Sequence, residues 1–278
     1  SICTDRAKIV TECYKKYEAA PPLIKRAYAL KETLQKMKIY IDEEELIVGN
    51  QASVPRAAPI FPEYAFEYIL DELDTFEARE SDQFYISKDN KEILRKILPW
   101  WKGKTLKERA EATQNEDVLK DRQIGVLGWS GNVSSGEGHI VPDYEMLLQY
   151  GFSGLLNQVK KILEQLDQSN IEDLKKVRFY KACIIVLEGC IAYIERYKQL
   201  AFIQMENCND IERKNELQMI ENNCHRLLKS APNTFYEALQ CTWFLHVILH
   251  VETNGHSISF GRLDQYLYPF LEKDLKMI

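Results

Sequence analysis

The sequence predicts a mainly α-helical protein with few short strands. Apolar residues recur at three- and four-residue intervals along most of its 278 positions, which is the spacing of one face of a helix. Helix-start signals precede several of these runs. Apolar residues make up 45% of the chain, which is enough for a sizeable core.

Helical spacing covers eight stretches, and several have a recognisable start. The stretches are, in chain order, 5–18, 22–37, 91–103, 143–166, 172–207, 211–229, 234–251 and 261–275. The helix over 143–166 follows Pro142 and begins with Asp143, a suitable N-cap residue. Two further helix starts have the spacing of a capping box, Thr105 with Glu108 and Thr234 with Glu237.

The long helix over 172–207 should place an apolar stripe on the core. Gly189 lies within it and weakens it only slightly. The residues expected to face inward are Phe179, Cys183, Val186, Leu187, Cys190, Ile191 and Ile194.

Strand candidates are confined to residues 38–41, residues 46–50 and the serines after Gly255. Three stretches rich in glycine, proline and serine resist helix formation: 49–63, 125–143 and 254–259. Irregular segments on a helical scaffold are where binding groups tend to lie.

Charge and hydropathy exclude two classes of partner. The net charge of −6 lacks the basic excess that a nucleic-acid backbone requires, so we expect no nucleic-acid partner. Apolar runs such as 182–187 are far shorter than the roughly 20 residues that cross a bilayer, so no membrane span is predicted. The first residues do not resemble a secretory signal, and we expect a cytoplasmic protein.

Neither the cysteines nor the paired histidines predict a metal site. The seven cysteines form no C-x-x-C motif and are expected to be reduced and mostly buried. His246 and His250 are four residues apart on a helix, as zinc ligands can be, but the glutamate of H-E-x-x-H is missing. We therefore interpret them as packed histidines and expect no metal.

The irregular stretches contain four polar residues that could form a site. His139 lies in a glycine-rich loop with no apolar stripe to join, and His256, Ser257 and Ser259 follow Gly255. An imidazole beside two hydroxyl groups can fix a small polar substrate, or it can cap the next helix. Spacing alone does not choose between these readings.

Three blocks of sequence resemble the amino-terminal part of a glycyl radical enzyme of the pyruvate formate-lyase superfamily. They are "ELIVGN" with "PRAAPIFPE", then "GEGHIVPDYEMLLQYGFSGLLNQ", then "TFYEALQCTWFLHVILHVETNGHSISFGRLDQYLYPF". A "GHI" loop combined with "NGHSIS" is most similar to the B12-independent glycerol and 1,2-propanediol dehydratases. Phe260 and Leu263 depart from this pattern, because relatives commonly have proline and phenylalanine there.

The resemblance implies a fold, a chemistry and roles for three residues. The fold would be the helical N-terminal part of an α/β barrel. A glycyl radical, installed by an S-adenosylmethionine and iron–sulfur activase, would pass its spin to a cysteine that takes a hydrogen atom from the diol. His139 would be the acid that assists departure of the hydroxyl group as water. His256 and Ser257 would bind the diol hydroxyls.

The resemblance also implies that residues 1–278 are only part of the enzyme. The family's cysteine loop, approximately G-C-V-E, and its radical loop, approximately R-V-x-G-Y, are absent from the sequence. We expect the chain alone to be inactive, the parent to be a homo-oligomer, and no cofactor to be bound in this part. Two alternatives stay open: a free-standing, non-catalytic binding or interaction module, and a fragment of another glycyl radical lyase that cleaves C–C, C–N or C–S bonds.

Overall fold

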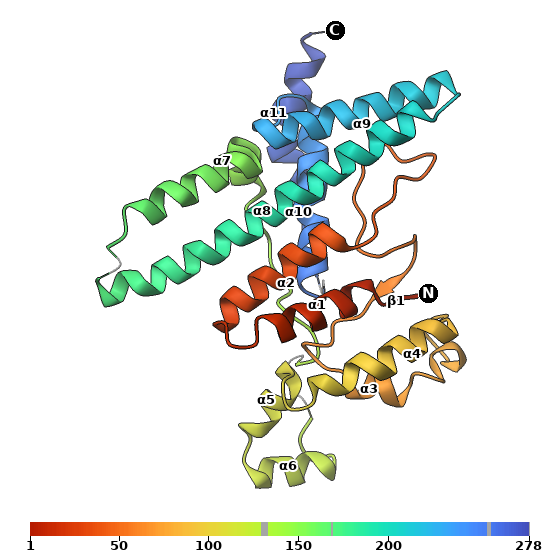
Figure 1. Cartoon of the computed structure of the whole chain (residues 1–278), viewed down its shortest axis with the longest axis vertical. Helices are drawn as coiled ribbons and strands as arrows, with labels where there is room; N and C mark the ends of the chain where they lie inside the picture. Colours follow the sequence, from red (N-terminus) through yellow and green to blue (C-terminus); the bar gives the residue numbers. More distant parts are fainter. Residues whose placement is uncertain (129–132, 168, 255–256, 278) are drawn as a thin grey trace.

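The computed structural model describes residues 1–128, 133–167, 169–254 and 257–277, and its regular secondary structure is almost all helical (Figure 1). The mainly α prediction is confirmed. The first half of the chain contains α1 (Asp5–Lys16), α2 (Pro22–Lys36), α3 (Glu67–Asp71), α4 (Lys88–Ile97), α5 (Leu106–Ala112) and α6 (Glu116–Gln123), with the 3-10 turns η1 (Phe76–Ala78) and η2 (Leu98–Trp101). The second half contains α7 (Tyr144–Glu164), α8 (Ile171–Glu206), α9 (Ile211–Lys229), α10 (Phe235–Glu252) and α11 (Leu263–Leu275).

The three helix caps that the sequence predicts are confirmed, whereas the short helices α3 and α6 were not predicted. Asp143 accepts a hydrogen bond from the amide of Met146 at the start of α7. Both capping boxes form, at Thr105 for α5 and at Thr234 for α10. Each cap satisfies backbone amides that have no partner within the first turn of a helix.

The predicted strands at 38–41, at 46–50 and at the serines after Gly255 are wrong for the residues that the structure describes. Among the described residues, the strands that form are β1 (Ile2–Cys3) and β2 (Ala58–Pro59), which pair in parallel. Residues 46–50 instead lie against helices, and side chains take the place of a neighbouring strand. The Gln240 amide accepts from Val48 N at 2.8 Å and donates to Val48 O at 2.7 Å.

Asn50 is held in the same way by two tyrosines of α8. Its backbone amide donates to the hydroxyls of Tyr193 and Tyr197, each at 3.0 Å. The Tyr193 hydroxyl in turn donates to Asn50 O at 2.5 Å. Polar side chains in the core therefore satisfy an irregular backbone segment that would otherwise be costly to bury.

Helix α7 contains a kink that the apolar spacing did not predict. Gly151 has φ 64° and ψ 168°, outside the helical region. A Cβ atom at this position would lie 3.0 Å from Ser230 O, so the close approach of α7 to the end of α9 also favours glycine.

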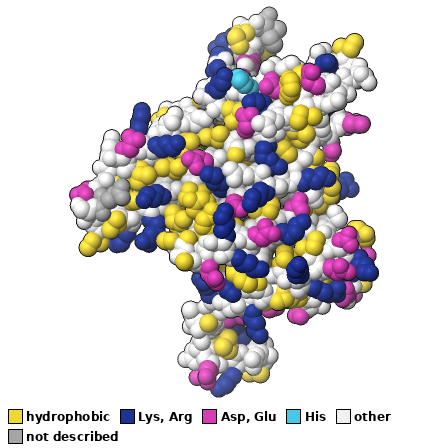
Figure 2. Space-filling model, in the orientation of Figure 1, with side chains coloured by type: hydrophobic (Ala, Val, Ile, Leu, Met, Phe, Trp, Pro, Cys, Tyr) yellow, Lys and Arg dark blue, Asp and Glu magenta, His cyan; other side chains and the backbone are white. Residues whose placement is uncertain are grey.

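The inward stripe predicted for α8 is only partly correct. Cys190 and Ile194 are buried, whereas Phe179 is 53% exposed. The stripe lines an apolar groove of about 580 Å³ between α2, α7, α8 and α10, and Phe179 lies at this groove rather than in the core. Figure 2 shows hydrophobic side chains gathered on the surface between α8 and α2.

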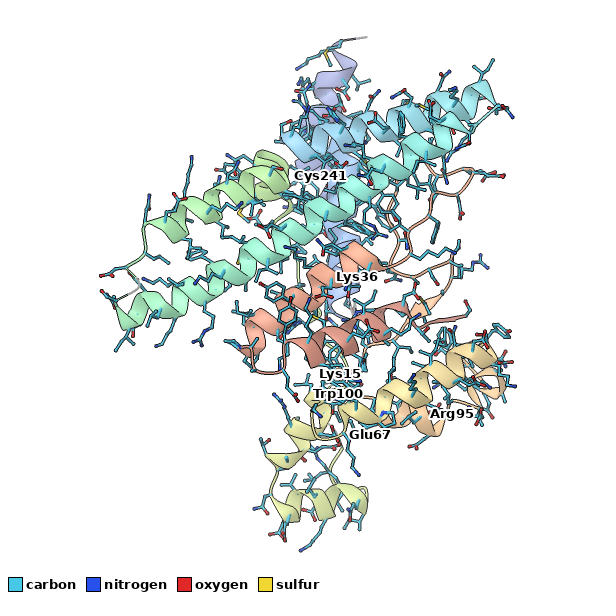
Figure 3. The ribbon with its side chains drawn as sticks, in the orientation of Figure 1. Lys15, Lys36, Glu67, Arg95, Trp100 and Cys241 are labelled. Atoms are coloured by element: carbon cyan, nitrogen blue, oxygen red, sulfur yellow. The ribbon has the colours of Figure 1, made fainter. Side chains whose placement is uncertain are left out.

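Two cores hold the helices together. The larger core packs α2, α7, α9 and α10 around α8, and Cys241 of α10 lies within it (Figure 3). The smaller core packs α1 against α3, α4 and η2 around Trp101, whose indole donates to Thr11 Oγ1 at 2.9 Å. The labelled side chains of Lys15 and Trp100 mark the junction between α1 and η2 in Figure 3.

All seven cysteines lie within the described residues and are free thiols, five of them buried, as expected. Among the described residues, no helix is long and apolar enough to cross a membrane.

Candidate functional site

The structure brings together two irregular segments that are far apart in the sequence. We call residues 133–143 the His139 segment and residues 253–261 the Ser257 segment. The Ser259 amide donates to Ile140 O at 2.9 Å, and the Thr253 hydroxyl donates to Glu137 O at 2.8 Å. The two segments are therefore joined at two points, one on each side of His139.

Two glycines allow the segments to approach closely. A Cβ atom at Gly136 would collide with the Thr253 hydroxyl and with the Tyr64 hydroxyl. Gly261 has φ 64°, and a Cβ atom there would lie 2.7 Å from Val141 Cγ1. Gly136 and Gly261 thus allow the two segments to pack closely.

His139 and Ser257 share an uncommon backbone conformation. Their φ angles are 54° and 58°, in the left-handed region that few residues other than glycine adopt. Both residues are exposed, while Ile258 is buried and anchors the Ser257 segment. Strained backbone of this kind tends to gather at functional sites, where it aims side chains that a relaxed loop would not aim.

The predicted site residues are thus placed in part. His139 and Ser257 belong to segments that are hydrogen-bonded to each other on either side of them. Ser259 is exposed and takes part in this pairing through its backbone amide. His256 lies outside the described residues. The catalytic and binding roles of these residues remain predictions.

An aromatic cluster fixes the other end of both segments. Tyr144, the first residue of α7, is 1% exposed, and its hydroxyl lies 3.0 Å from His246 Nδ1. Phe260 stacks on the His246 ring with the ring centroids 3.9 Å apart. The Tyr266 hydroxyl donates to Phe260 O at 2.8 Å. Phe260, a departure from the family pattern, therefore has a packing role beside the site.

Burial makes His246 a neutral histidine. Desolvation, with a smaller contribution from His250, lowers the pKa of His246 to about 4. Burial also raises the pKa of Tyr144, so its phenol stays protonated. Tyr144 and His246 therefore share a hydrogen bond between two uncharged groups at neutral pH.

The interpretation of His246 and His250 as packed histidines is confirmed. His250 Nδ1 lies 2.8 Å from His246 O, so it carries the proton and donates to that carbonyl, and the two rings lie 4.4 Å apart. Across the described ranges, no three His, Cys, Asp or Glu side chains gather closely enough to hold a metal ion.

The structure contains a further network of charged residues that was not predicted from the sequence. Arg26 of α2 pairs with Glu252 at the end of α10, and its guanidinium also donates to the Tyr64 hydroxyl at 3.3 Å. Arg6 and Glu63 form a second pair beside it. Their separations along the chain follow no helical or strand period, so no spacing signal could have identified them.

Residues 1–277 match the family described as "Pyruvate formate lyase-like". The chain belongs to this family, and the recognition of a glycyl radical enzyme is confirmed.

Several curated relatives share nearly the whole chain. It is 37% identical over 276 residues to a probable dehydratase of Escherichia coli and 38% identical over 281 residues to a (2S)-3-sulfopropanediol dehydratase of Klebsiella oxytoca. It is 31% identical over 284 residues to an isethionate sulfite-lyase of Nitratidesulfovibrio vulgaris. Each match covers 99% of this chain and 34% of the relative, so the chain spans about a third of the length of these relatives.

The chain also superposes closely on solved structures of glycyl radical dehydratases. An enzyme of 1,2-propanediol dehydration from Roseburia inulinivorans superposes with a TM-score of 0.96 at 34% identity, over 100% of this chain and 33% of that one. The glycerol-bound B12-independent glycerol dehydratase from Clostridium butyricum superposes with a TM-score of 0.93 at 37% identity, over 97% of this chain and 34% of that one.

Proposed function

We propose that this chain is the N-terminal part of a glycyl radical diol dehydratase that removes water from glycerol or 1,2-propanediol to give an aldehyde. The observation that carries the proposal is the convergence of the His139 and Ser257 segments. Similarity to dehydratases of glycerol, propanediol and sulfopropanediol supports it. A lyase acting on a sulfonate is the second candidate, because an isethionate sulfite-lyase is 31% identical.

His139 is the proposed acid. Hydroxide is a poor leaving group, so a proton donor near the departing C2 hydroxyl lowers the barrier to C–O cleavage. Imidazole titrates near neutral pH and can donate a proton at little cost. The left-handed backbone at His139 directs its side chain from a segment fixed on both sides, which suits an acid that must lie at one place.

Ser257 and His256 are the proposed binding residues for the diol. A serine hydroxyl can both donate and accept a hydrogen bond, so it suits a substrate hydroxyl in either role. Ser257 is held between the buried Ile258 and the end of α10. The radical groups of the complete enzyme would abstract the hydrogen atom. The residues of this chain would bind and orient the diol and protonate its departing hydroxyl group.

The partners follow from the same proposal. A radical S-adenosylmethionine activase would be needed to install the glycyl radical, whose R-V-x-G-Y motif is absent from the 278 residues. Assembly into a homo-oligomer stays a prediction.

The test is a comparison of two variants in the complete, activated enzyme. His139→Ala should lower kcat by roughly 100- to 10,000-fold with little change in KM, because general acid catalysis acts when the C–O bond breaks. Ser257→Ala should act mainly on KM, because its hydrogen bond already exists in the bound ground state. His225→Ala, an exposed histidine of α9, is the matched control and should be unchanged. A His139→Ala enzyme with near-normal kcat would remove the acid role.

A further inference from the structure

Arg6 of α1 is a buried cation that links the first helix to the end of α10. It is 5% exposed. Its Nε donates to Val251 O at 2.7 Å, and its Nη2 donates to Glu252 O at 3.2 Å. Both acceptors lie in the last turn of α10, more than 240 residues away along the chain.

The remaining donors of Arg6 are also used. Nη1 donates to Glu63 Oε2 at 3.1 Å and to Ile60 O at 3.4 Å, and Nη2 pairs with Glu63 Oε1. The five N–H groups of the guanidinium therefore have five acceptors. Glu63 neutralises the buried charge, which makes burial of the arginine tolerable. Lysine could not reproduce this arrangement, because its ammonium group is a compact point donor rather than a planar fork.

This contact fixes how the chain leaves α10. The last carbonyls of a helix have no partner within the helix, and here Arg6 supplies one for Val251 and Glu252. The cationic guanidinium also suits the negative end of the helix dipole. At Thr253 the backbone becomes extended, with φ −122° and ψ 140°, and the Ser257 segment begins.

Thr253 connects the end of α10 to the His139 segment. Its hydroxyl donates to Glu137 O at 2.8 Å, two residues before His139. Its side chain also lies where a Cβ atom at Gly136 would clash. One rigid junction thus sets the start of the Ser257 segment and the approach of the His139 segment.

We propose that Arg6 is a positioning residue for the candidate site: it touches no substrate, and it places Ser257 and His139 by fixing the end of α10. The functional part of this inference rests on the proposed function. The structural part is that Arg6 keeps the backbone of the two segments in one conformation, and it does not depend on the reaction.

The chain contains a matched control. Arg196 of α8 also caps the end of a helix, donating to Leu34 O at 2.7 Å and to Met37 O at 2.5 Å at the end of α2. It is half-buried and contacts neither segment of the site through these bonds. Arg196→Lys therefore reports what the loss of a helix-capping arginine does to the fold away from the site.

The first experiment measures backbone amide hydrogen exchange in the 278-residue protein. Arg6→Lys should speed exchange about tenfold or more in residues 253–261 and 136–141, with α9 unchanged. Arg196→Lys should leave both segments at wild-type rates. If Arg6→Lys fails to fold, Glu63→Gln, which removes one acceptor and the neutralising charge, should give a smaller acceleration in the same residues. Wild-type exchange of both segments in a folded Arg6→Lys or Glu63→Gln protein would overturn the inference.

The second experiment measures dehydration by the complete, activated enzyme. Arg6→Lys should lower kcat/KM by roughly 100-fold, because a displacement of about 1 Å at a site is enough for such a loss, while Arg196→Lys should lower it by less than about threefold. Wild-type kinetics in Arg6→Lys would overturn the functional role. If the wild-type enzyme dehydrates no diol but exchange still responds to Arg6→Lys, the proposed function fails and the positioning role is supported.

Discussion

At the scale of single residues, His246 is the group whose protonation the fold controls most clearly. Its ring packs against Phe260 and His250 and lies beside the Tyr144 hydroxyl, and partial burial lowers its pKa to about 4 from an ordinary value of 6.5. Between these two pH values the unfolded chain binds a proton that the folded chain does not. The free energy of unfolding should therefore fall as the pH falls through this window.

This predicts a measurable loss of stability in mild acid. Between pH 7 and pH 5, the His246 contribution to the free energy of unfolding should fall by about 1 kcal/mol, after a discount for its partial exposure. His246→Phe should remove this part of the pH dependence, whereas His225→Phe, at an exposed site of α9, should retain it. Urea denaturation of the three proteins at both pH values checks it. An equal pH dependence in wild type and His246→Phe would contradict the environment described for His246.

Candidate site residues could be predicted from the sequence only where they belong to a family motif. His139 and Ser257 stand in glycine-flanked loops whose resemblance to a family was readable. Arg6, Tyr64 and Tyr144 were missed, because each acts through a partner brought close only by folding. Long-range polar contacts leave no period in the sequence, so they cannot be recovered from one chain.

At the scale of elements, residues 46–50 show why a strand-like pattern failed. Val48 is fully buried, and its amide and carbonyl are both satisfied by Gln240 of α10. The apolar pattern correctly indicated burial, but it could not indicate that the partner is a glutamine side chain. Helix ends were predictable to within a few residues, because caps are local signals, whereas the kink at Gly151 depends on the approach of Ser230.

Gln240→Leu should therefore be strongly destabilising. It leaves Val48 N and Val48 O buried without partners, at a cost of about 2–4 kcal/mol in the free energy of unfolding. Gln199→Leu, at an exposed position of α8, should change stability by less than about 0.5 kcal/mol. Equilibrium urea denaturation compares the two. Equal losses of stability in the two variants would show that the hydrogen bonds between Gln240 and Val48 contribute no more than a surface glutamine does.

At the scale of the whole molecule, the helical architecture was predictable from periodicity, and the family from three blocks of sequence. The chain spans about a third of the relatives that it matches. The apolar groove between α2, α7 and α8 shows that the stripe of α8 is only half covered within the described residues. No local pattern distinguishes a stripe that is fully buried from one that borders a groove.

The 278-residue protein on its own should form no glycyl radical. Incubated without oxygen with the activase and S-adenosylmethionine, it should give no doublet in the electron paramagnetic resonance spectrum, because the R-V-x-G-Y motif is absent. The complete protein under the same conditions is the positive control. A doublet from the 278-residue protein alone would overturn the view that the radical site lies elsewhere.

The most direct test of the central claim is the product that the complete, activated protein forms from a 1,2-diol. With 1,2-propanediol or glycerol, one equivalent of aldehyde should form for each diol consumed, and His139→Ala should lose that activity. Sulfite release from a hydroxysulfonate, with no aldehyde from either diol, would contradict the dehydratase assignment and favour a C–S lyase of the same family.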